Sequence, residues 1–174
     1  MDAPDALDAN GLRVVTMTPT LAPALNRFHE QLSAATITRR FFSVHPHLSP
    51  EELTRFTTVD HLDREALVAL DDADEIVAVA RFDRLSPGSS TAEVAFVVTD
   101  RWQHLGIGTA LFARLAARSA ELGVDTFIAD TLATNRAMLA VFQHAGFPLR
   151  AQFDEGVVSV TIELAAEPSR KERR

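Results

Sequence analysis

The sequence predicts an α+β domain with a mixed, mostly antiparallel sheet flanked by helices. The 174-residue chain, with 47% hydrophobic and 24% charged residues, has the size and composition of one globular domain. Three strand-like runs, residues 65–70, 75–85 and 91–99, follow one another across short turns, as antiparallel neighbours do. They are apolar on both faces, so we expect layers that cover both sides of the sheet. The whole pattern lacks the regular strand–helix–strand repeat of a parallel sheet.

The N-terminal part of the chain contains one strand candidate and two helix candidates. Residues 12–17 are expected to form a short strand. A helix is expected to begin at Thr18-Pro19, with apolar residues at helical spacing: Leu21, Leu25, Phe28 and Leu32. A second helix is expected after Ser49, which has the character of an N-cap, with Pro50 at the first helical position.

The C-terminal part of the sequence is expected to form helices and strands in alternation. A helix is expected after Trp102, and Gly123 is expected to end it. One apolar face of that helix is formed by Leu111, Phe112, Leu115, Ala116 and Leu122. The remaining elements are a strand, a helix and a final strand pair, at residues 125–130, 135–146, 147–153 and 157–164. We expect one domain over residues 11–165, between flexible tails at residues 1–10 and 166–174.

The composition argues against several classes of protein. The net charge of −7 at pH 7 is unfavourable for binding nucleic acid. The apolar stretches are too short for a membrane span, and the acidic start is unlike a secretory signal, so we expect no membrane and a cytoplasmic location. The absence of Cys excludes thiolate metal sites and cysteine nucleophiles. His45, His47 and His61 are interpreted as loop histidines, and no metal is expected.

The junction at residues 97–112 is the most informative segment. A strand runs directly into a turn, Gln103-His104-Leu105-Gly106-Ile107-Gly108, and a helix follows at once. Glycines at such a junction let backbone N–H groups converge at a helix N-terminus, where the partial positive charge holds a pyrophosphate. No Gly-Lys-Ser/Thr follows, so a Walker loop is excluded, and the late position in the chain fits a Rossmann turn poorly.

This turn, together with residues 135–147, resembles the GNAT superfamily of acyl-CoA-dependent N-acetyltransferases. The phosphate-binding motif Gln/Arg-x-x-Gly-x-Gly/Ala and the later Asn helix with Gly-Phe are matched by Gln103, Gly106, Gly108, Asn135, Gly146 and Phe147. The order of elements agrees over residues 12–163. The resemblance implies the GNAT (acyl-CoA N-acyltransferase) fold, an acyltransferase activity and acetyl-CoA as co-substrate.

A narrower resemblance extends over residues 38–56, 59–70, 92–111 and 135–147. These segments resemble the acetyltransferase domain of Pat-type protein lysine acetyltransferases, which modify a lysine of AMP-forming acyl-CoA synthetases and of other proteins. The implied partner is therefore a protein that presents a lysine, acetylated by direct transfer. Two alternatives remain open: a small-amine or protein N-terminal acetyltransferase, and a non-catalytic acyl-CoA-binding sensor.

Glu93 is the candidate catalytic residue. A lysine ε-amine has a pKa near 10.4 and must lose a proton to react, so a carboxylate beside the thioester can serve as general base. The resemblance places Glu93 at that point of the motif, and burial there would raise its pKa. The alternative is an ion-paired glutamate at the edge of the sheet.

The resemblance also implies which residues contact acetyl-CoA. The pantetheine is expected to pair with backbone at Phe96, Val97 and Val98, with the N–H of Val98 as donor to the thioester carbonyl. The pyrophosphate is expected at the turn, which comprises Gln103, His104, Leu105, Gly106, Ile107, Gly108 and Thr109. Asn135 is expected to bind the pantetheine or the pyrophosphate, or to act only as a helix N-cap.

Two departures from the family pattern affect the chemistry. Phe142 stands where many members have Tyr, and the chain has no Tyr at all, so water, a Ser/Thr or a backbone donor must protonate the leaving thiolate. The turn has His104-Leu105 where many relatives have a basic pair, which leaves the backbone as the main phosphate ligand. The run Arg39-Arg40-Phe41-Phe42 is interpreted as packing residues with a solvated arginine.

Overall fold

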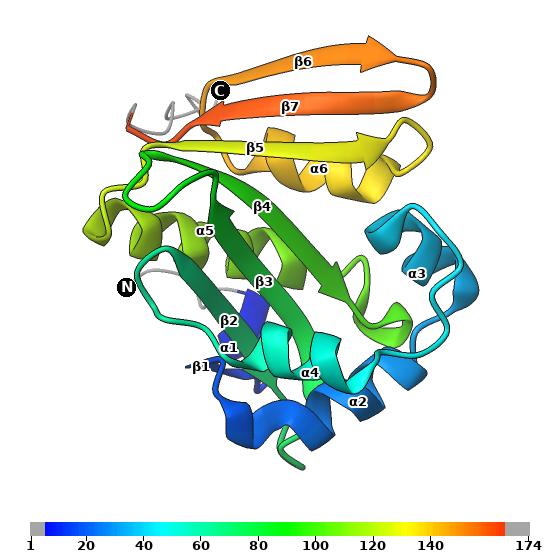
Figure 1. Ribbon diagram of the computed structural model, residues 1–174. Coiled ribbons are helices and arrows are strands. Elements are labelled where there is room, and N and C mark those ends of the chain that lie inside the picture. The colour runs from blue at the N-terminus through cyan, green and yellow to red at the C-terminus, as the bar shows by residue number, and fades with distance from the viewer. Residues whose placement is uncertain (1–5, 166–174) are drawn as a thin grey trace.

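A seven-stranded sheet organises the part of the chain that the structure describes, residues 6–165 (Figure 1). In this computed structural model the strand order is β1-β2-β3-β4-β5-β7-β6. The strands are β1 (Arg13–Thr16), β2 (Arg64–Leu70), β3 (Ile76–Arg84), β4 (Thr91–Val98), β5 (Thr126–Leu132), β6 (Leu149–Asp154) and β7 (Val157–Glu163). Only β4 and β5 pair in parallel among these neighbours. The predicted α+β fold with a mixed, mostly antiparallel sheet is confirmed.

Helices lie on both faces of the sheet. The helical elements are α1 (Ala6–Ala9), η1 (Pro19–Leu21), α2 (Ala22–Glu30), α3 (Ala34–Phe41), α4 (Pro50–Thr57), η2 (Asp100–Trp102), α5 (Ile107–Glu121) and α6 (Arg136–His144). In Figure 1, α5 and α6 lie behind the sheet and α2 and α4 lie in front of it. α3 contacts β4 and β5 near the open side of the molecule.

Two hydrophobic cores fix these layers. Behind the sheet, aromatic rings of α5, α6 and the strands pack edge to face, as Phe112 does against Phe142 with ring centroids 5.8 Å apart. In front, Phe28 of α2 packs with Val68 and Val79 of the sheet. Strands β2 and β3 are buried on both faces, as their apolar runs predict, whereas β4 alternates between buried and exposed residues.

Most elements begin and end where the sequence predicts. Ser49 and Glu52 form a capping box at the start of α4, with Pro50 at the first position. Gly123, with φ of +77°, follows the last turn of α5. The helix expected at Thr18 begins as the 3-10 turn η1 before α2.

The structure differs from the sequence prediction in three places. The sequence prediction contains no helix at residues 34–41, where α3 begins after its N-cap Ser33 and buries Ile37 in the front core. β7 lies between β5 and β6, so the last two strands do not add to the sheet in chain order. Residues 6–9, part of the expected N-terminal tail, form α1, and Leu7 is fully buried against the core. The rest of the expected tails, residues 1–5 and 166–174, lies outside the described residues.

Asp100 holds the start of α3 against the end of β4. Its carboxylate accepts hydrogen bonds from the Ser33 amide (3.0 Å), the Ser33 hydroxyl (2.6 Å) and the Thr36 hydroxyl (2.9 Å). Burial acts to raise the pKa of Asp100, but the hydrogen bonds from Ser33 and Thr36 outweigh it and leave this pKa below its usual range. The N-terminus of α3 thus depends on a carboxylate from a distant part of the chain.

We therefore expect Asp100→Ala to lower the free energy of unfolding by about 1–2 kcal/mol at pH 7. Because the pKa of Asp100 is lower in the folded protein than in the unfolded chain, its stabilisation is complete above the unfolded value near 3.9 and is lost as the pH falls through the folded value. Urea denaturation at pH 7 and below pH 4 measures both effects. Asp72→Ala, at an exposed turn residue, is the control. A difference from wild type that persists unchanged below pH 3 would contradict the role of the ionised carboxylate.

Candidate active site

The site begins where β4 and β5 separate. β4 pairs with β5 only over Thr91–Glu93, and the two strands diverge beyond that range (Figure 1). Hydrogen bonds of an antiparallel strand alternate between its two sides. The amide of Thr99 donates to Val77 O at the end of the β3–β4 pair (2.9 Å). The backbone N–H and C=O groups of odd-numbered residues of β4 therefore point toward β3. The backbone groups of Phe96 and Val98 consequently face the gap between the strands.

A cavity of about 340 Å³ occupies this gap. Its walls are formed by β4, the N-terminus of α5, one side of α6 and part of α3. Ten of the eleven predicted acetyl-CoA contacts line it: Phe96, Val97, Val98, Gln103, His104, Gly106, Ile107, Gly108, Thr109 and Asn135. Leu105 lies in the same turn but does not line the cavity, and its side chain is 47% exposed.

The turn before α5 leaves the N-terminus of this helix open. Gly106 is the N-cap and makes no capping hydrogen bond through a side chain. The first amides of an α-helix have no acceptor within the helix, so those of Ile107, Gly108 and Thr109 are available at the cavity wall. Gly106 has a φ of +78°, a backbone conformation that favours glycine. This arrangement of amides, with the positive end of a 15-residue helix, fits an anionic group such as a pyrophosphate.

Two polar side chains that the sequence predicts to contact acetyl-CoA have structural roles. Gln103 Nε2 donates to Val98 O (2.9 Å) and lies 3.3 Å from Thr36 Oγ1, so it ties the end of β4 to α3. Asn135 is the N-cap of α6, with its Oδ1 accepting from the Met138 amide (3.2 Å). Asn135 therefore caps the helix and also lines the cavity, where a ligand contact would use its Nδ2.

The cavity wall also contains residues that the sequence does not assign to it, and three of them carry unused donors or positive charge. Arg39 and Arg40, interpreted as part of a packing segment, both line the cavity from α3. Burial lowers the pKa of Arg40, an effect that the charges of Glu93 and Asp83 partly oppose. Trp102 also lines the cavity, and its buried Nε1 has no hydrogen-bond partner. An unused buried donor and two guanidinium groups suit a long, anionic and partly apolar ligand.

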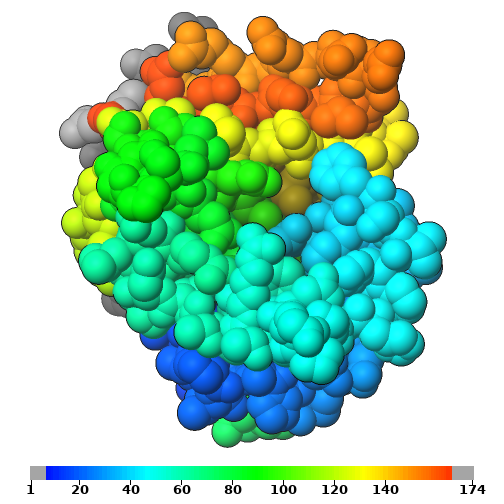
Figure 2. Space-filling view, in the orientation of Figure 1, coloured from blue at the N-terminus to red at the C-terminus, as the bar shows by residue number. Residues whose placement is uncertain are grey.

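Glu93 lies at the point where β4 and β5 part. It is paired in register with Asp83 of β3 and Ile128 of β5. Its side chain is exposed and not buried. Figure 2 shows a hollow bordered by the green β4, the yellow β5 and the cyan end of α3, with α6 visible at its bottom. Glu93 is not among the residues that line the cavity, but its charge acts on Arg40, which lines it.

Phe142 is a core residue. Its side chain is 1% exposed and packs edge to face against Phe96 (5.6 Å) and Phe112 (5.8 Å). The position that carries Tyr in many family members therefore points into hydrophobic packing in this chain.

The described residues contain no group of three or more His, Cys, Asp or Glu side chains arranged to hold a metal ion. His45, His47 and His61 do not converge on one point, since His45 contacts Glu52 and His61 contacts the buried Glu65. Within residues 6–165, no helix has the length and apolar character of a membrane span.

The fold and this cavity define an acetyltransferase, and the comparison with known families agrees. The profile of the Acetyltransferase (GNAT) family matches residues 31–147, so the chain belongs to the GNAT family. It is accordingly an acyltransferase that uses acetyl-CoA as its acyl donor. A putative acetyltransferase of Salmonella typhimurium, solved with its cofactor acetyl-CoA, shares the fold at a TM-score of 0.72 and 18% identity, over 92% of this chain and 99% of its own.

Within the family the chain is similar to Pat acetyltransferases. It is 33% identical to the acetyltransferase Pat of Mycolicibacterium smegmatis over 137 residues, which is 77% of this chain and 40% of the relative. The chain therefore spans well under half the length of that relative. The crystal structure of the GNAT domain of S. lividans PAT superposes with a TM-score of 0.83 at 34% identity, over 93% of this chain and 99% of that domain.

The open turn at α5 leads to a testable expectation. Gly106→Ala and Gly123→Ala place the same side chain at the two ends of α5, where φ is +78° and +77°. Both substitutions should lower stability by about 1 kcal/mol, because an L-residue is strained in that conformation. Only Gly106→Ala should also weaken acetyl-CoA binding, by 10-fold or more, since it displaces the amides at the cavity.

The fluorescence of Trp102, the single Trp of the chain, provides the binding signal because this residue lines the cavity. Thermal unfolding measures the strain in each variant. Equal acetyl-CoA affinities in the two variants would show that the turn does not hold the cofactor.

Proposed function

We propose that this chain is a cytoplasmic protein lysine acetyltransferase, with Glu93 as the general base and direct transfer of the acetyl group. The observation that carries the proposal is a cavity walled by an unpaired strand edge and an open helix N-terminus, with an accessible carboxylate, Glu93, on the strand that forms this edge. The similarity to Pat acetyltransferases supports a protein acceptor.

Acetyl-CoA would lie across the gap between β4 and α6. The pyrophosphate would accept hydrogen bonds from the amides of Ile107, Gly108 and Thr109, with the side chain of Arg39 adding positive charge. The pantetheine would run beside β4 and use the backbone groups of Phe96. Val98 O is already bonded to Gln103, which leaves the Val98 N–H to donate to the thioester carbonyl oxygen. This donor would stabilise the negative charge that develops on that oxygen during attack.

Glu93 would remove the proton that the acceptor must lose. A lysine ε-amine is protonated at neutral pH, and Glu93 can accept its proton directly or through one water molecule on the exposed side of β4. The amine nitrogen then forms the new C–N bond, the C–S bond breaks, and its electron pair leaves on the sulfur of CoA. The nitrogen loses its second proton as the amide forms, and this loss balances the one proton taken up by the thiolate.

The proton donor to the sulfur must be a group other than Phe142. Thr109 and His144 line the cavity and carry exchangeable protons. The hydroxyl of Thr36 also lines it, but its proton is donated to Asp100. The open N-terminus of α5 would further stabilise a thiolate nearby.

The acceptor would approach from the front of the molecule. In Figure 1 none of the helices in the described chain lies in front of β5, β7 or β6, and the hollow in Figure 2 opens on the same side. Asp130 of β5 adds an exposed carboxylate to this face. With a net charge of −7, the protein favours the approach of a basic segment.

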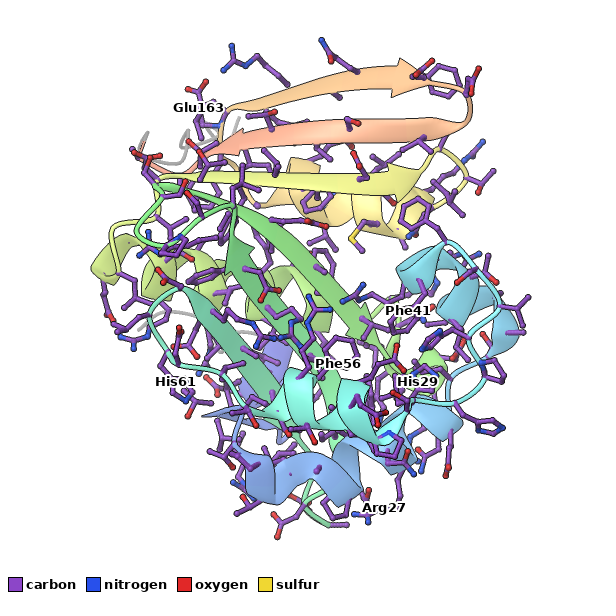
Figure 3. The ribbon with its side chains drawn as sticks, in the orientation of Figure 1. Arg27, His29, Phe41, Phe56, His61 and Glu163 are labelled. Atoms are coloured by element: carbon purple, nitrogen blue, oxygen red, sulfur yellow. The ribbon has the colours of Figure 1, made fainter. Side chains whose placement is uncertain are left out.

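We expect Glu93→Gln to lower kcat by 10²- to 10³-fold and to leave the acetyl-CoA affinity within 2-fold of wild type, because the amide keeps the shape but cannot take a proton. The control is Glu163→Gln, at an exposed glutamate paired with Arg150 on the same side of the sheet (2.8 Å), which should retain full activity (Figure 3). Near-wild-type turnover of Glu93→Gln at neutral pH would exclude this residue as the base.

The acceptor class is tested with labelled acetyl-CoA. Purified AMP-forming acyl-CoA synthetases, polyamines and peptides with free N-termini serve as acceptors in parallel, and mass spectrometry locates the label. Acetylation of a synthetase lysine is the expected result. Labelling only of polyamines or of peptide N-termini would assign the chain to the small-amine or N-terminal enzymes. Binding of acetyl-CoA without transfer to any of them would indicate a sensor.

A further inference from the structure

A second, smaller cavity, which we call the inner cavity, lies next to the 340 Å³ cavity at β4. Its volume is about 40 Å³, and it lies between β3, β4 and the helices of the front layer. Both cavities are lined by Arg40, Phe96 and Val97, so they adjoin at the part of β4 where the acyl end of the donor would lie. The inner cavity is largely apolar, with Phe41 and Phe56 in its wall (Figure 3).

Arg81 is the unusual residue of the inner cavity. Its side chain is 7% exposed, and its Nη2 has no hydrogen-bond partner. Its other contacts are weak: Nη1 lies 3.4 Å from Phe56 O, and Cζ lies 5.0 Å from the centre of the Phe56 ring. A buried guanidinium with an unused donor is costly unless an anion satisfies it.

The carboxylate nearest to Arg81 is mainly engaged elsewhere. Asp83 Oδ1 accepts a short hydrogen bond from Arg64 Nε (2.6 Å), whereas Arg81 Nε lies 3.6 Å from Asp83 Oδ2. Burial lowers the pKa of Arg81 to about 10; the charge of Asp83 opposes this, and the positive charges of Arg64, Arg40 and Arg55 add to it. The inner cavity is therefore surrounded by more positively than negatively charged side chains.

The size of the inner cavity limits what can enter. A single water molecule needs about 10–15 Å³ of such volume, so this cavity holds about three heavy atoms. A carboxylate has three heavy atoms and forms charge-assisted hydrogen bonds with a guanidinium. His29 also lines the cavity, but its Nε2 is already paired with His45 O (2.7 Å).

We propose that the inner cavity receives the terminal carboxylate of a short dicarboxylic acyl group, with Arg81 as the specificity-determining residue. The acyl donors would then include malonyl-CoA or succinyl-CoA beside acetyl-CoA. The bond changes of the transfer stay the same, since the added carboxylate takes no part in them. This inference rests on the proposed placement of the donor along β4, and it is independent of which acceptor is modified.

Isothermal titration calorimetry of the full chain with acetyl-, butyryl-, malonyl- and succinyl-CoA tests the proposal without any acceptor. For the wild-type protein we expect malonyl- or succinyl-CoA to bind at least as tightly as acetyl-CoA and at least 10-fold more tightly than butyryl-CoA. This comparison needs no variant, so it stands even if substitutions at Arg81 impair folding. A preference for butyryl-CoA over both dicarboxylic donors would overturn the proposal.

Variants then assign the preference to one side chain. Arg81→Met should lose the affinity for the dicarboxylic donor by 10-fold or more, keep that for acetyl-CoA and gain affinity for butyryl-CoA, while Arg81→Lys should retain part of the preference. Arg27→Met is the matched control, because Arg27 pairs with the partly exposed Glu75 (3.0 Å) and lines neither cavity (Figure 3). An equal loss for all donors in Arg81→Met would show a structural role only.

One further outcome distinguishes an acyl carboxylate from a carboxylate of the acceptor as the ligand of Arg81, and two others separate this proposal from the proposed function. If the guanidinium binds the acceptor, a free amino acid will bind to the wild-type protein and not to Arg81→Met, while all donors keep equal affinities; that result overturns the assignment to the acyl group. If acetyl-CoA itself fails to bind, the proposed function fails as well. Failure of lysine transfer with the expected donor affinities contradicts only the proposed function.

Discussion

The separation of β4 from β5 is the constraint on which the rest of the site depends. Backbone groups in a protein interior need hydrogen-bond partners, so an unpaired strand edge must be satisfied by other means. Gln103 donates a hydrogen bond to the carbonyl of Val98, and the remaining backbone groups of this strand edge face the cavity. The same separation admits the N-terminus of α5 and the side of α6 to one space. A continuous β4–β5 ladder would close the cavity and leave the helix end without an anion to bind.

The position of α3 is a second condition for this site. α3 carries Thr36, Arg39 and Arg40 to the cavity wall. Its N-terminus is held by Asp100, which belongs to the segment between β4 and the phosphate turn. The wall that α3 forms is thus fastened to the segment that follows β4.

Local sequence signals predicted much of the fold and of the site. Ser49 with Glu52 marks the start of α4, and Gly106 with Gly108 marks the turn before α5, because capping and positive-φ positions depend on residues a few places apart. Two features depended on contacts between distant segments and could not be predicted in this way. They are the insertion of β7 between β5 and β6 and the second cavity at Arg81.

The sequence by itself determined the α+β class, the open turn at Gly106, and Glu93 as a carboxylate on the preceding strand, since each rests on residue type and short spacing. The tertiary structure decided that Asn135 caps α6, that Gln103 ties β4 to α3, and that Arg81 is buried with an unused donor. The physical reason is that burial and hydrogen-bond pairing depend on which segments meet in space. The same arginine is an ordinary polar residue in the sequence and a buried charge in the fold.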